Sequence, residues 1–508
     1  MTLAYTRVRT DIFPPYLFRL MIPSGLHHIA ALRREGLKVW DASTRQNEIR
    51  KPFIVFATAD GPGLTTLNGL VGHCGKIGCR LHCPLPSRRK PEGKHYYPVL
   101  LKPDNYSVRG CDHGDVDIWR LSLNCPSAGL ARKYRADLRF VQESQGHNQY
   151  ENRRRETGIG RPSIFDGLPP NSILGIPAMF PGDCMHIISL NITDLLLGLW
   201  RGTITCDDTD RKASWTWAVL RGQTWQKHGK AVAACTPHLP GSFDRPPRNP
   251  ALKISSGYKA WEFLMYIFGL GPGLLYQVLP TTYWKNFCKL VTGVRLLLQR
   301  SVTRSQLQEA HRLLIGFAIE FEHIYLQRRF DRIHFVCQSI HYLMHMAPET
   351  SRVGPNLYYS QWPIERTIGN LGEELKQHSN PYRNFSERCV LRAQVNTLKV
   401  MAPELDRNRD KIPRGAIELG DGYFLLHATD SCARNLRKPE NDALKQYIEQ
   451  CTGLAIEENW ATKVVRWARV KLPNGQISRC AWKETRKPLN KLRISRNVKV
   501  SFSHTFAS

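Results

Sequence analysis

The chain has 508 residues, of which 72 are Lys or Arg and 43 are Asp or Glu, so its formal net charge is +29 with histidine neutral. Hydrophobic residues make up 42% of the chain, which excludes both a wholly disordered and a membrane-embedded protein. No window approaches the roughly 18 uninterrupted apolar residues of a membrane span, and residues 1–9 lack the apolar core of a secretory signal. The composition therefore predicts a soluble, folded chain with roughly three domains.

The cysteine content and the positive charge limit the cellular setting and the partner. Fourteen cysteines are too few for a disulfide scaffold in a chain of this length, so we expect reduced thiols and an intracellular protein. The charge favours a long polyanion as partner, because each Lys or Arg placed against a phosphate releases counterions. Nucleic acid ranks first and an anionic membrane surface second.

In the N-terminal third, helical spacing of apolar residues predicts a helix over residues 25–37. The continuous apolar run 51–59 predicts a buried strand that ends in a turn at Asp60-Gly-Pro-Gly. Residues 67–106 are rich in Gly, Pro, Cys and His and show little periodicity, so we expect an irregular module there. A helical, charged piece follows at 130–155, and then a Gly- and Pro-rich loop at 158–181.

The middle of the chain is predicted to be mostly helical, and the C-terminal part partly β. Helical spacing is strongest over residues 305–346, and it recurs at 183–199, 215–232, 259–268, 284–299, 364–377 and 386–398. Short β-like runs then occur at 423–426, 463–472 and 476–482, and Pro473-Asn474-Gly475 between the last two indicates a hairpin. We place a domain boundary near residues 402–414.

Asp60 is the first candidate for chemistry. A carboxylate at the C-terminal end of a buried strand is where α/β sheets place metal ligands. The alternative is a turn-forming Asp, which is the commoner use of Asp before Gly-Pro-Gly.

The second candidate is a zinc site. Cys79 and Cys83 lie in GHCGKIGCRLHCP, which also contains His73 and Cys74, and His95 follows in GKHYYP. Two cysteines at this spacing suit a tetrahedral zinc ion completed by histidines. Metal binding would also explain how a segment with few aliphatic residues becomes ordered. The alternative is a loop with free thiols, since no second close Cys pair completes a set of four.

Two further candidates lie at helix starts. Asp183 and His186 are three residues apart, so they share a helix face and could meet a metal or a phosphate together. Asp183 could instead be an N-cap. Glu365, next to Arg366, is either a metal ligand or half of a surface ion pair.

Three histidines receive a structural interpretation. His334, His341 and His345 fall on one helical face, and the last two have the spacing of a zinc-binding helix. The residues between them include no Glu to act as a base, so we interpret all three as core or packing histidines.

Basic residues suited to phosphate contact occur in two regions. The first is the Pro-rich loop FDRPPR, and the second is the segment beyond Thr462, where twelve Lys or Arg face one acid, a net charge of +11. Trp467 and Trp482 are interleaved there and could stack on bases. A solvated connector or face is the alternative in both regions. The candidate DNA-contacting residues are Arg245, Arg248, Arg366, Arg466, Arg469 and Lys483.

Taken in order, long motifs resemble the transposases of CACTA (En/Spm) elements, and most closely the form abundant in mushroom-forming fungi. The resemblance runs from about Leu17 to the end of the chain. The motifs that carry it are GLHHIAALRREGLKVWDAS, FATADGPGLTTLNGLVGHCGKIGCRLHCPL, HYYPVLLKPDNY, PGDCMHIISLNITDLLLGLWRG, LPGSFDRPPRNPALKISSGYKAWEFL, HFVCQSIHYLMHMAPE and SQWPIERTIGNLGEELKQHS.

The resemblance implies an RNase H-like catalytic core with a helical insertion, and metal-dependent DNA cleavage and strand transfer at transposon ends. By motif, Asp60 corresponds to the second acidic ligand and Glu365 to the closing Glu, which together would hold Mg²⁺ or Mn²⁺. Asp183 and His186 correspond to the Asp-x-x-His pair of the family. The family's Cys/His module falls on Cys79 and Cys83 with His73 and His95. The resemblance therefore implies these four residues as zinc ligands.

The resemblance also implies a first catalytic Asp on a strand before the motif that begins at Gly25. Residues 1–23 do not match such a strand, so we expect the core to be incomplete at its N-terminus and strand transfer to be impaired. Asp11 and Asp41 are the acids that could replace it. The expected fold is α/β, with a partial RNase H-like core (1–66), a Cys/His-rich module (67–157), the rest of the core with a large all-α insertion (158–402) and a small basic, partly β domain (403–508).

The implied partner is double-stranded DNA, on which the chain could form a homo-oligomer, and the implied location is the nucleus; no membrane and no small-molecule substrate are expected. Two alternatives remain open. One is a domesticated or relic DNA-binding protein without catalysis, and the other is a zinc-dependent nucleic-acid-binding regulator.

Overall fold

The computed structural model describes residues 15–41, 43–123, 128–239, 246–255, 257–374, 379–402, 404, 414–473, 475 and 477–480. The chain divides into two compact units, Met1–His228 with Ser255–Arg388, and Gly229–Ile254 with Cys389–Ser508. The fold is mixed α/β, mostly helical with small sheets, which agrees with the α/β class expected from the sequence. Every candidate metal ligand of the sequence lies in the first unit.

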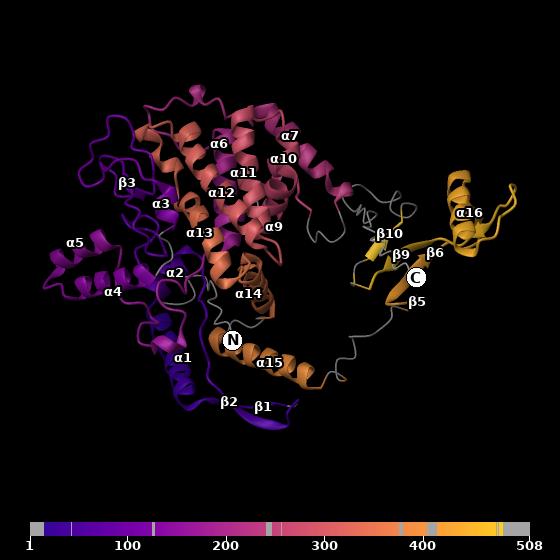
Figure 1. Ribbon diagram of the computed structural model, residues 1–508, viewed down its shortest axis with the longest axis horizontal. Helices are drawn as coiled ribbons and strands as arrows, with labels where there is room; N and C mark the ends of the chain where they lie inside the picture. Colours follow the sequence, from indigo (N-terminus) through magenta and orange to yellow (C-terminus); the bar gives the residue numbers. More distant parts are fainter. Residues whose placement is uncertain are drawn as a thin grey trace. The chain divides into compact units, whose positions relative to one another are not determined.

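The first unit begins with helix α1 (Pro15–Glu35) and an antiparallel hairpin of β1 (Leu37–Asp41) and β2 (Gln46–Arg50) (Figure 1). The helix expected over residues 25–37 is confirmed as far as Glu35. Gly36 ends it with a φ of +87°, a left-handed conformation that suits glycine. The chain then turns directly into the hairpin.

The apolar run 51–59 is extended, but the prediction of a fully buried strand is wrong for one of its faces. Ile54 pairs with residues 172–174, and Ala57 N donates to Met179 O at 2.9 Å. Ile54 and Ala57 pack against an apolar cluster that includes Leu64 and Phe180. Phe53 and Val55, on the alternate positions, are each 47% exposed. Burial therefore alternates over residues 51–56 and becomes continuous only over residues 57–59.

The Cys- and His-rich stretch is irregular, as expected, and is followed by helices. Within it the structure has only the short antiparallel strands β3 (Arg88–Arg89) and β4 (Tyr96–Tyr97) among its described residues. The charged helical piece forms two helices, because the helical conformation is interrupted just before and at Gly146. These helices and the one before them are α3 (Ile118–Leu123), α4 (Ala128–Gln142) and α5 (His147–Thr157).

The helical body of the first unit contains the predicted helices of the middle of the chain. Helices α6, α11, α12 and α13 lie side by side (Figure 1). An aromatic core joins them: the rings of Trp200 and Phe287 lie 5.2 Å apart, and Trp200 donates its indole N–H to Tyr325 at 3.0 Å. Its elements are η2 (Met185–Ile192), α6 (Thr193–Arg201), the first half of α7 (Gly222–Ala234), α9 (Ala260–Phe263), η5 (Leu264–Leu270), α10 (Gly271–Leu274), α11 (Thr281–Leu297), α12 (Arg304–Phe321), η6 (Glu322–Leu326), η7 (Phe330–Phe335), α13 (Gln338–Val353) and α14 (Trp362–Glu374).

The second unit contains α8 (Pro250–Lys253), most of α15 (Pro381–Met401) and a four-stranded antiparallel sheet in the order β10-β9-β6-β5. Its strands are β5 (Ile417–Gly420), β6 (Tyr423–Thr429), β9 (Trp467–Lys471) and β10 (Ile477–Arg479). The last three fall in the predicted β-like runs, whereas β5 was not predicted. A short pair, β7 (Arg434–Asn435) and β8 (Lys463–Val464), accompanies α16 (Lys438–Thr452). Helix α16 is not among the predicted helices.

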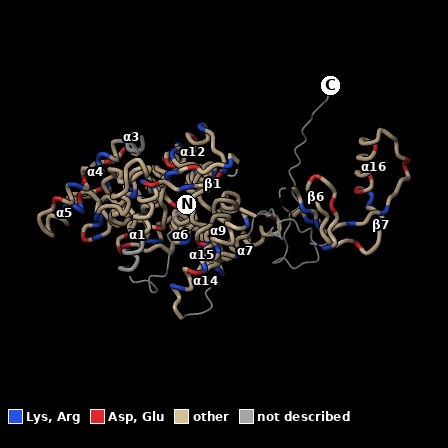
Figure 2. Tube along the Cα trace, turned by 90° about the horizontal axis from the view of Figure 1, so that it is seen from below, with Lys and Arg blue, Asp and Glu red and all other residues tan. Residues whose placement is uncertain are grey.

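Charge is spread over the described residues of both units, with Lys and Arg interspersed among Asp and Glu (Figure 2). Some basic side chains are held by acids within the first unit, for example Lys90 by Asp207 at 2.5 Å. Among the residues that the structure describes, no helix is both long and apolar enough to cross a membrane.

Helix α2 (Gly61–Asn68) begins directly after Asp60, and its C-terminal cap gives a test of the fold. Gly69 has a φ of +72°, and its carbonyl accepts hydrogen bonds from Gly160 and Arg161. A Cβ atom at this position would lie 2.2 Å from the carbonyl oxygen of Arg161.

We expect Gly69→Ala to lower the free energy of unfolding by on the order of 2 kcal/mol or more, because a left-handed φ and a backbone clash both oppose the side chain. Urea denaturation followed by circular dichroism measures this. Gly167→Ala is the control, because a Cβ atom there meets nothing within 4 Å. Equal stability of the two variants would contradict the described cap.

Candidate metal centre and acidic pocket

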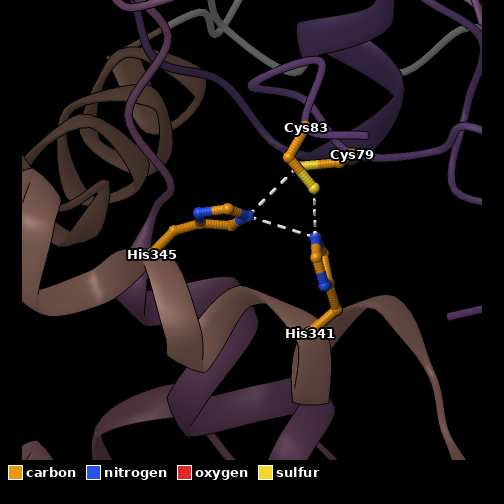
Figure 3. A group of neighbouring side chains, drawn as sticks. All are labelled: Cys79, Cys83, His341 and His345. Atoms are coloured by element: carbon orange, nitrogen blue, oxygen red, sulfur yellow. Dashed lines mark hydrogen bonds between the residues drawn. The ribbon is translucent and has the colours of Figure 1, made fainter. Parts of the chain in front are cut away.

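Four buried side chains from two distant segments form one group: Cys79, Cys83, His341 and His345 (Figure 3). The sulfur of Cys79 lies 3.3 Å from Nε2 of His345, and the sulfur of Cys83 lies 3.2 Å from Nε2 of His341. The two Nε2 atoms are 3.1 Å apart. All four ligand atoms lie within 4.8 Å of one another.

These distances are slightly shorter than the edges of a zinc tetrahedron. With Zn–S near 2.3 Å and Zn–N near 2.0 Å, tetrahedral ligands are separated by about 3.3 to 3.8 Å. Two thiols and two imidazoles are also a donor set that zinc prefers at closed, structural sites. The protein therefore has a buried Cys2His2 group that could bind zinc.

Local structure explains how each pair of ligands is presented. Cys79 and Cys83 lie at the ends of a tight turn, in which the N–H of His82 bonds to Cys79 O at 2.9 Å. His82 itself binds Asp137 at 2.8 Å. On α13, the spacing of four residues places His341 and His345 one above the other on the same face.

The protonation states expected from this environment are those of ligands. Burial by itself would raise the pKa of Cys79, but the hydrogen bond from Cys83 and the charges of His345 and His341 hold that pKa well below its usual value. Burial lowers the pKa of His341, against the opposing effect of Cys79. A thiolate beside a neutral imidazole is the form that binds a metal ion.

The structure brings the two predicted cysteines together, but it groups them with His341 and His345 and not with the two predicted histidines. His73 and His95 belong to a different group, which they form with Cys74. The reason is the backbone: Tyr96 N bonds to Cys74 O at 3.1 Å, and this bond places His95 beside Cys74.

The two missing ligands are the histidines that we interpreted as core residues. His341 and His345 are indeed buried, but they face the cysteine pair. Their spacing was the available signal. The lack of a Glu between the two histidines argues against a catalytic zinc site, but a structural zinc site needs no such base.

A cavity of about 740 Å³ adjoins this group, and acidic residues line another part of it. Asp60, Asp183 and His186 line the cavity together with Cys79 and His341. Three segments that are far apart in the sequence thus contribute polar groups to one concave surface.

Asp60 follows the extended run and caps α2. Its Oδ1 accepts a hydrogen bond from Gly63 N at 2.9 Å, which is the turn role that we considered as the alternative. The residue is half-buried and faces the cavity. A carboxylate has two oxygens and about four lone-pair positions, so capping is compatible with binding a metal ion.

Asp183 is 2% exposed, and both of its oxygens accept hydrogen bonds. Oδ2 accepts from the backbone N–H of His186 at 3.0 Å and lies 2.6 Å from the ring Nδ1 of that residue. Oδ1 accepts from Gln361 N at 2.8 Å. Asp183 is therefore an N-cap, and it also orients His186 and fixes the start of α14.

Glu365 lies one turn into α14, where its N–H bonds to Gln361 O at 2.9 Å. Asp183 thus connects the segment of His186 to the helix of Glu365. Burial would by itself lower the pKa of His186, but the hydrogen bond to Asp183 and the charge of that carboxylate oppose this effect. The charges of Asp60 and Glu365 raise the pKa further, so both carboxylates lie close enough to His186 to interact with it.

Of the candidate DNA-contacting residues that the structure describes, Arg366 belongs to the first unit, and Arg248, Arg466 and Arg469 belong to the second. Arg248 and Arg366 are exposed. Arg466 pairs with Asp430 at 2.9 Å, and Arg469 donates to the carbonyl of His427 at 2.8 Å. Arg245 and Lys483 lie outside the described residues.

With the geometry established, the chain was compared with known proteins: no family model, no curated protein and no solved structure matches it.

We predict that the purified chain retains about one zinc ion after dialysis against a weak chelator. Cys79→Ser and His345→Ala should each remove this ion and make residues 67–106 sensitive to proteolysis, because metal binding stabilises the fold. Elemental analysis measures the zinc. Cys432→Ser, which replaces an exposed cysteine, is the control and should retain it. A wild-type chain without retained zinc would contradict the site.

We also predict that His186 titrates above its ordinary pKa of 6.5. A raised pKa means that the protonated ring stabilises the fold below pH 6.5 and that this contribution is lost as the pH rises through the folded-state pKa. NMR titration of the ring should show that the pKa of His186 is raised less in Glu365→Gln than in the wild type, and least in Asp183→Asn. The exposed Glu92→Gln is the matched control. An unchanged pKa in Glu365→Gln would place that carboxylate away from His186.

Proposed function

We propose that the chain is a DNA transposase-like protein of the CACTA type, built on an RNase H-like core. The function of that family is metal-dependent DNA cleavage and strand transfer at transposon ends. One observation carries the proposal: Asp60, Asp183 and His186 line one cavity, and Asp183 accepts a hydrogen bond from Gln361 N, one turn before Glu365 on α14. These residues follow the chain order that the resemblance implies.

Acidic residues at and near the cavity suit hard divalent cations: Asp60 lines the cavity, and Glu365 lies in the first turn of α14. Asp60 and Glu365 offer carboxylate oxygens, and Mg²⁺ is usually bound through one or two carboxylates with water in its remaining positions. In this proposal these two residues hold Mg²⁺ or Mn²⁺. Such ions supply activation of a water or 3′-hydroxyl nucleophile and stabilisation of the leaving oxygen.

Asp183 and His186 then act as positioning and phosphate-binding groups. Asp183 has both oxygens occupied by hydrogen bonds, so its function is to orient His186 and the start of α14. The raised pKa of His186 favours the protonated ring. A protonated imidazole on the cavity wall can donate to a phosphate oxygen of bound DNA.

The zinc ion of this proposal is structural. Cys79, Cys83, His341 and His345 form a closed set of four buried ligands, which leaves no position for a substrate. Its effect is to hold the loop of Cys79 on α13, next to the cavity.

A DNA-binding protein without catalysis is the second candidate, and the position of Asp41 favours it. The resemblance implies a third carboxylate from a preceding strand. Asp41 instead accepts hydrogen bonds from the backbone and the hydroxyl of Ser43, at 2.8 and 2.6 Å, in the turn of the first hairpin. Asp11 lies outside the described residues.

We expect the 508-residue chain to bind duplex DNA through phosphates, because its net charge is +29. If six or more phosphates are contacted, affinity falls on the order of a thousandfold between low and moderate salt. Cleavage of supercoiled DNA in Mn²⁺ is the activity expected of the catalytic protein. Asp60→Asn or Glu365→Gln should abolish cleavage and leave binding intact.

The control for cleavage is Asp112→Asn, which replaces an exposed acid outside the pocket. Binding without cleavage by every chain tested would favour the non-catalytic protein. Salt-independent binding would contradict both candidates. Cleavage that survives Asp60→Asn would remove Asp60 from the catalytic site.

A further inference from the structure

We propose that His73, Cys74 and His95 bind a second zinc ion, at a solvent-accessible site with three protein ligands. One ligand atom of each residue lies within 4.8 Å of the other two. The site shares no residue with the buried Cys2His2 group, and the proposal does not depend on the proposed function.

The first two ligands are presented by a tight turn over residues 72–75. Gly75 N bonds to Gly72 O at 2.9 Å and closes the turn. A Cβ atom at Gly75 would lie 2.3 Å from Cγ2 of Val71, so the backbone is packed too closely there for a side chain. The turn thus holds His73 and Cys74 in a defined conformation.

The third ligand is brought to this turn by the β3–β4 ribbon. Tyr96 N donates to Cys74 O at 3.1 Å, which joins β4 to the turn directly. The ring of His95 stacks on Tyr97, with centroids 4.3 Å apart and an interplanar angle of 1°. Its other neighbour is the ring of His73, whose centroid lies 5.7 Å away. Stacking therefore orients His95 toward the two residues of the turn.

The donor set defines the class of ligand. A thiolate and two imidazoles suit borderline-soft divalent ions, of which Zn²⁺ is the common one in proteins. His73 and Cys74 are exposed and His95 is half-buried, in contrast to the fully buried Cys2His2 group. Three protein ligands leave a fourth position of the tetrahedron for water or another small ligand. His73 also lines the cavity that contains Asp60 and His186.

The exposure of Cys74 makes the site testable in the intact, unmodified chain. A zinc-bound thiolate reacts slowly with alkylating reagents, because its electron pair is bound to the metal. The reduced 508-residue chain, with its tightly held zinc in place, is treated with iodoacetamide with and without added Zn²⁺. Mass spectrometry of peptides then measures the alkylation rate of Cys74 relative to Cys432, an exposed thiol of the other unit.

We expect added Zn²⁺ to slow alkylation of Cys74 on the order of tenfold or more and to leave Cys432 unchanged. His73→Ala and His95→Ala should each abolish the protection, and His147→Ala, which replaces an exposed histidine elsewhere in the first unit, should retain it. Alkylation of Cys74 at an unchanged rate in Zn²⁺ would overturn the proposal. Protection that survives both His73→Ala and His95→Ala would also overturn it, because the thiol would then bind zinc without the imidazoles.

Discussion

The contact between the Cys79–Cys83 turn and helix α13 is the constraint on which the rest of the first unit depends. Cys83 and His341 are separated by 258 positions in the chain and lie 3.2 Å apart. Closing a loop of this length costs conformational entropy, and a segment with few aliphatic residues has little apolar area to offset that cost. Four ligands to one metal ion would supply the stabilisation that offsets this entropy cost. This explains why Cys and His side chains cluster at the contact between the turn and α13.

The same helix transmits this constraint to the acidic pocket. Arg80, next to Cys79, forms an ion pair with Glu349 of α13 and lies over the ring of Tyr342. Glu349 also accepts a hydrogen bond from Gly182 N at 3.1 Å. Gly182 precedes Asp183, so one buried carboxylate connects the metal centre to the start of η2.

That connection has little tolerance for change. Glu349 is 0% exposed, and removing one partner of a buried ion pair leaves a charge uncompensated, at a cost of about 3 to 5 kcal/mol. A Cβ atom on Gly182 would lie 2.3 Å from the ring of Tyr342, so the backbone must pass the ring without a side chain. The position of Asp183 therefore depends on Gly182, Tyr342 and Glu349.

The sequence allowed prediction of what each segment presents, but not of which segments meet. Spacing showed that His341 and His345 share a helix face and that Cys79 and Cys83 form a pair; nothing local indicated that they face each other across 258 positions. Helix α16, by contrast, could have been predicted locally. Its Pro439 and Glu440 are helix-start signals, and Leu444, Tyr447, Ile448 and Cys451 recur at helical spacing.

The local interpretations of Asp60 and Asp183 turned out to be compatible with their proposed roles. Asp60 caps α2 through Oδ1, and this bond fixes the carboxylate at the end of the extended run. Asp183 caps the helical segment that contains η2, and the same carboxylate accepts hydrogen bonds from His186 and Gln361. A group that must meet a metal ion or a phosphate gains from being oriented before it does so. Capping provides that orientation, so an ordinary helix-start signal and a functional residue can be one and the same side chain.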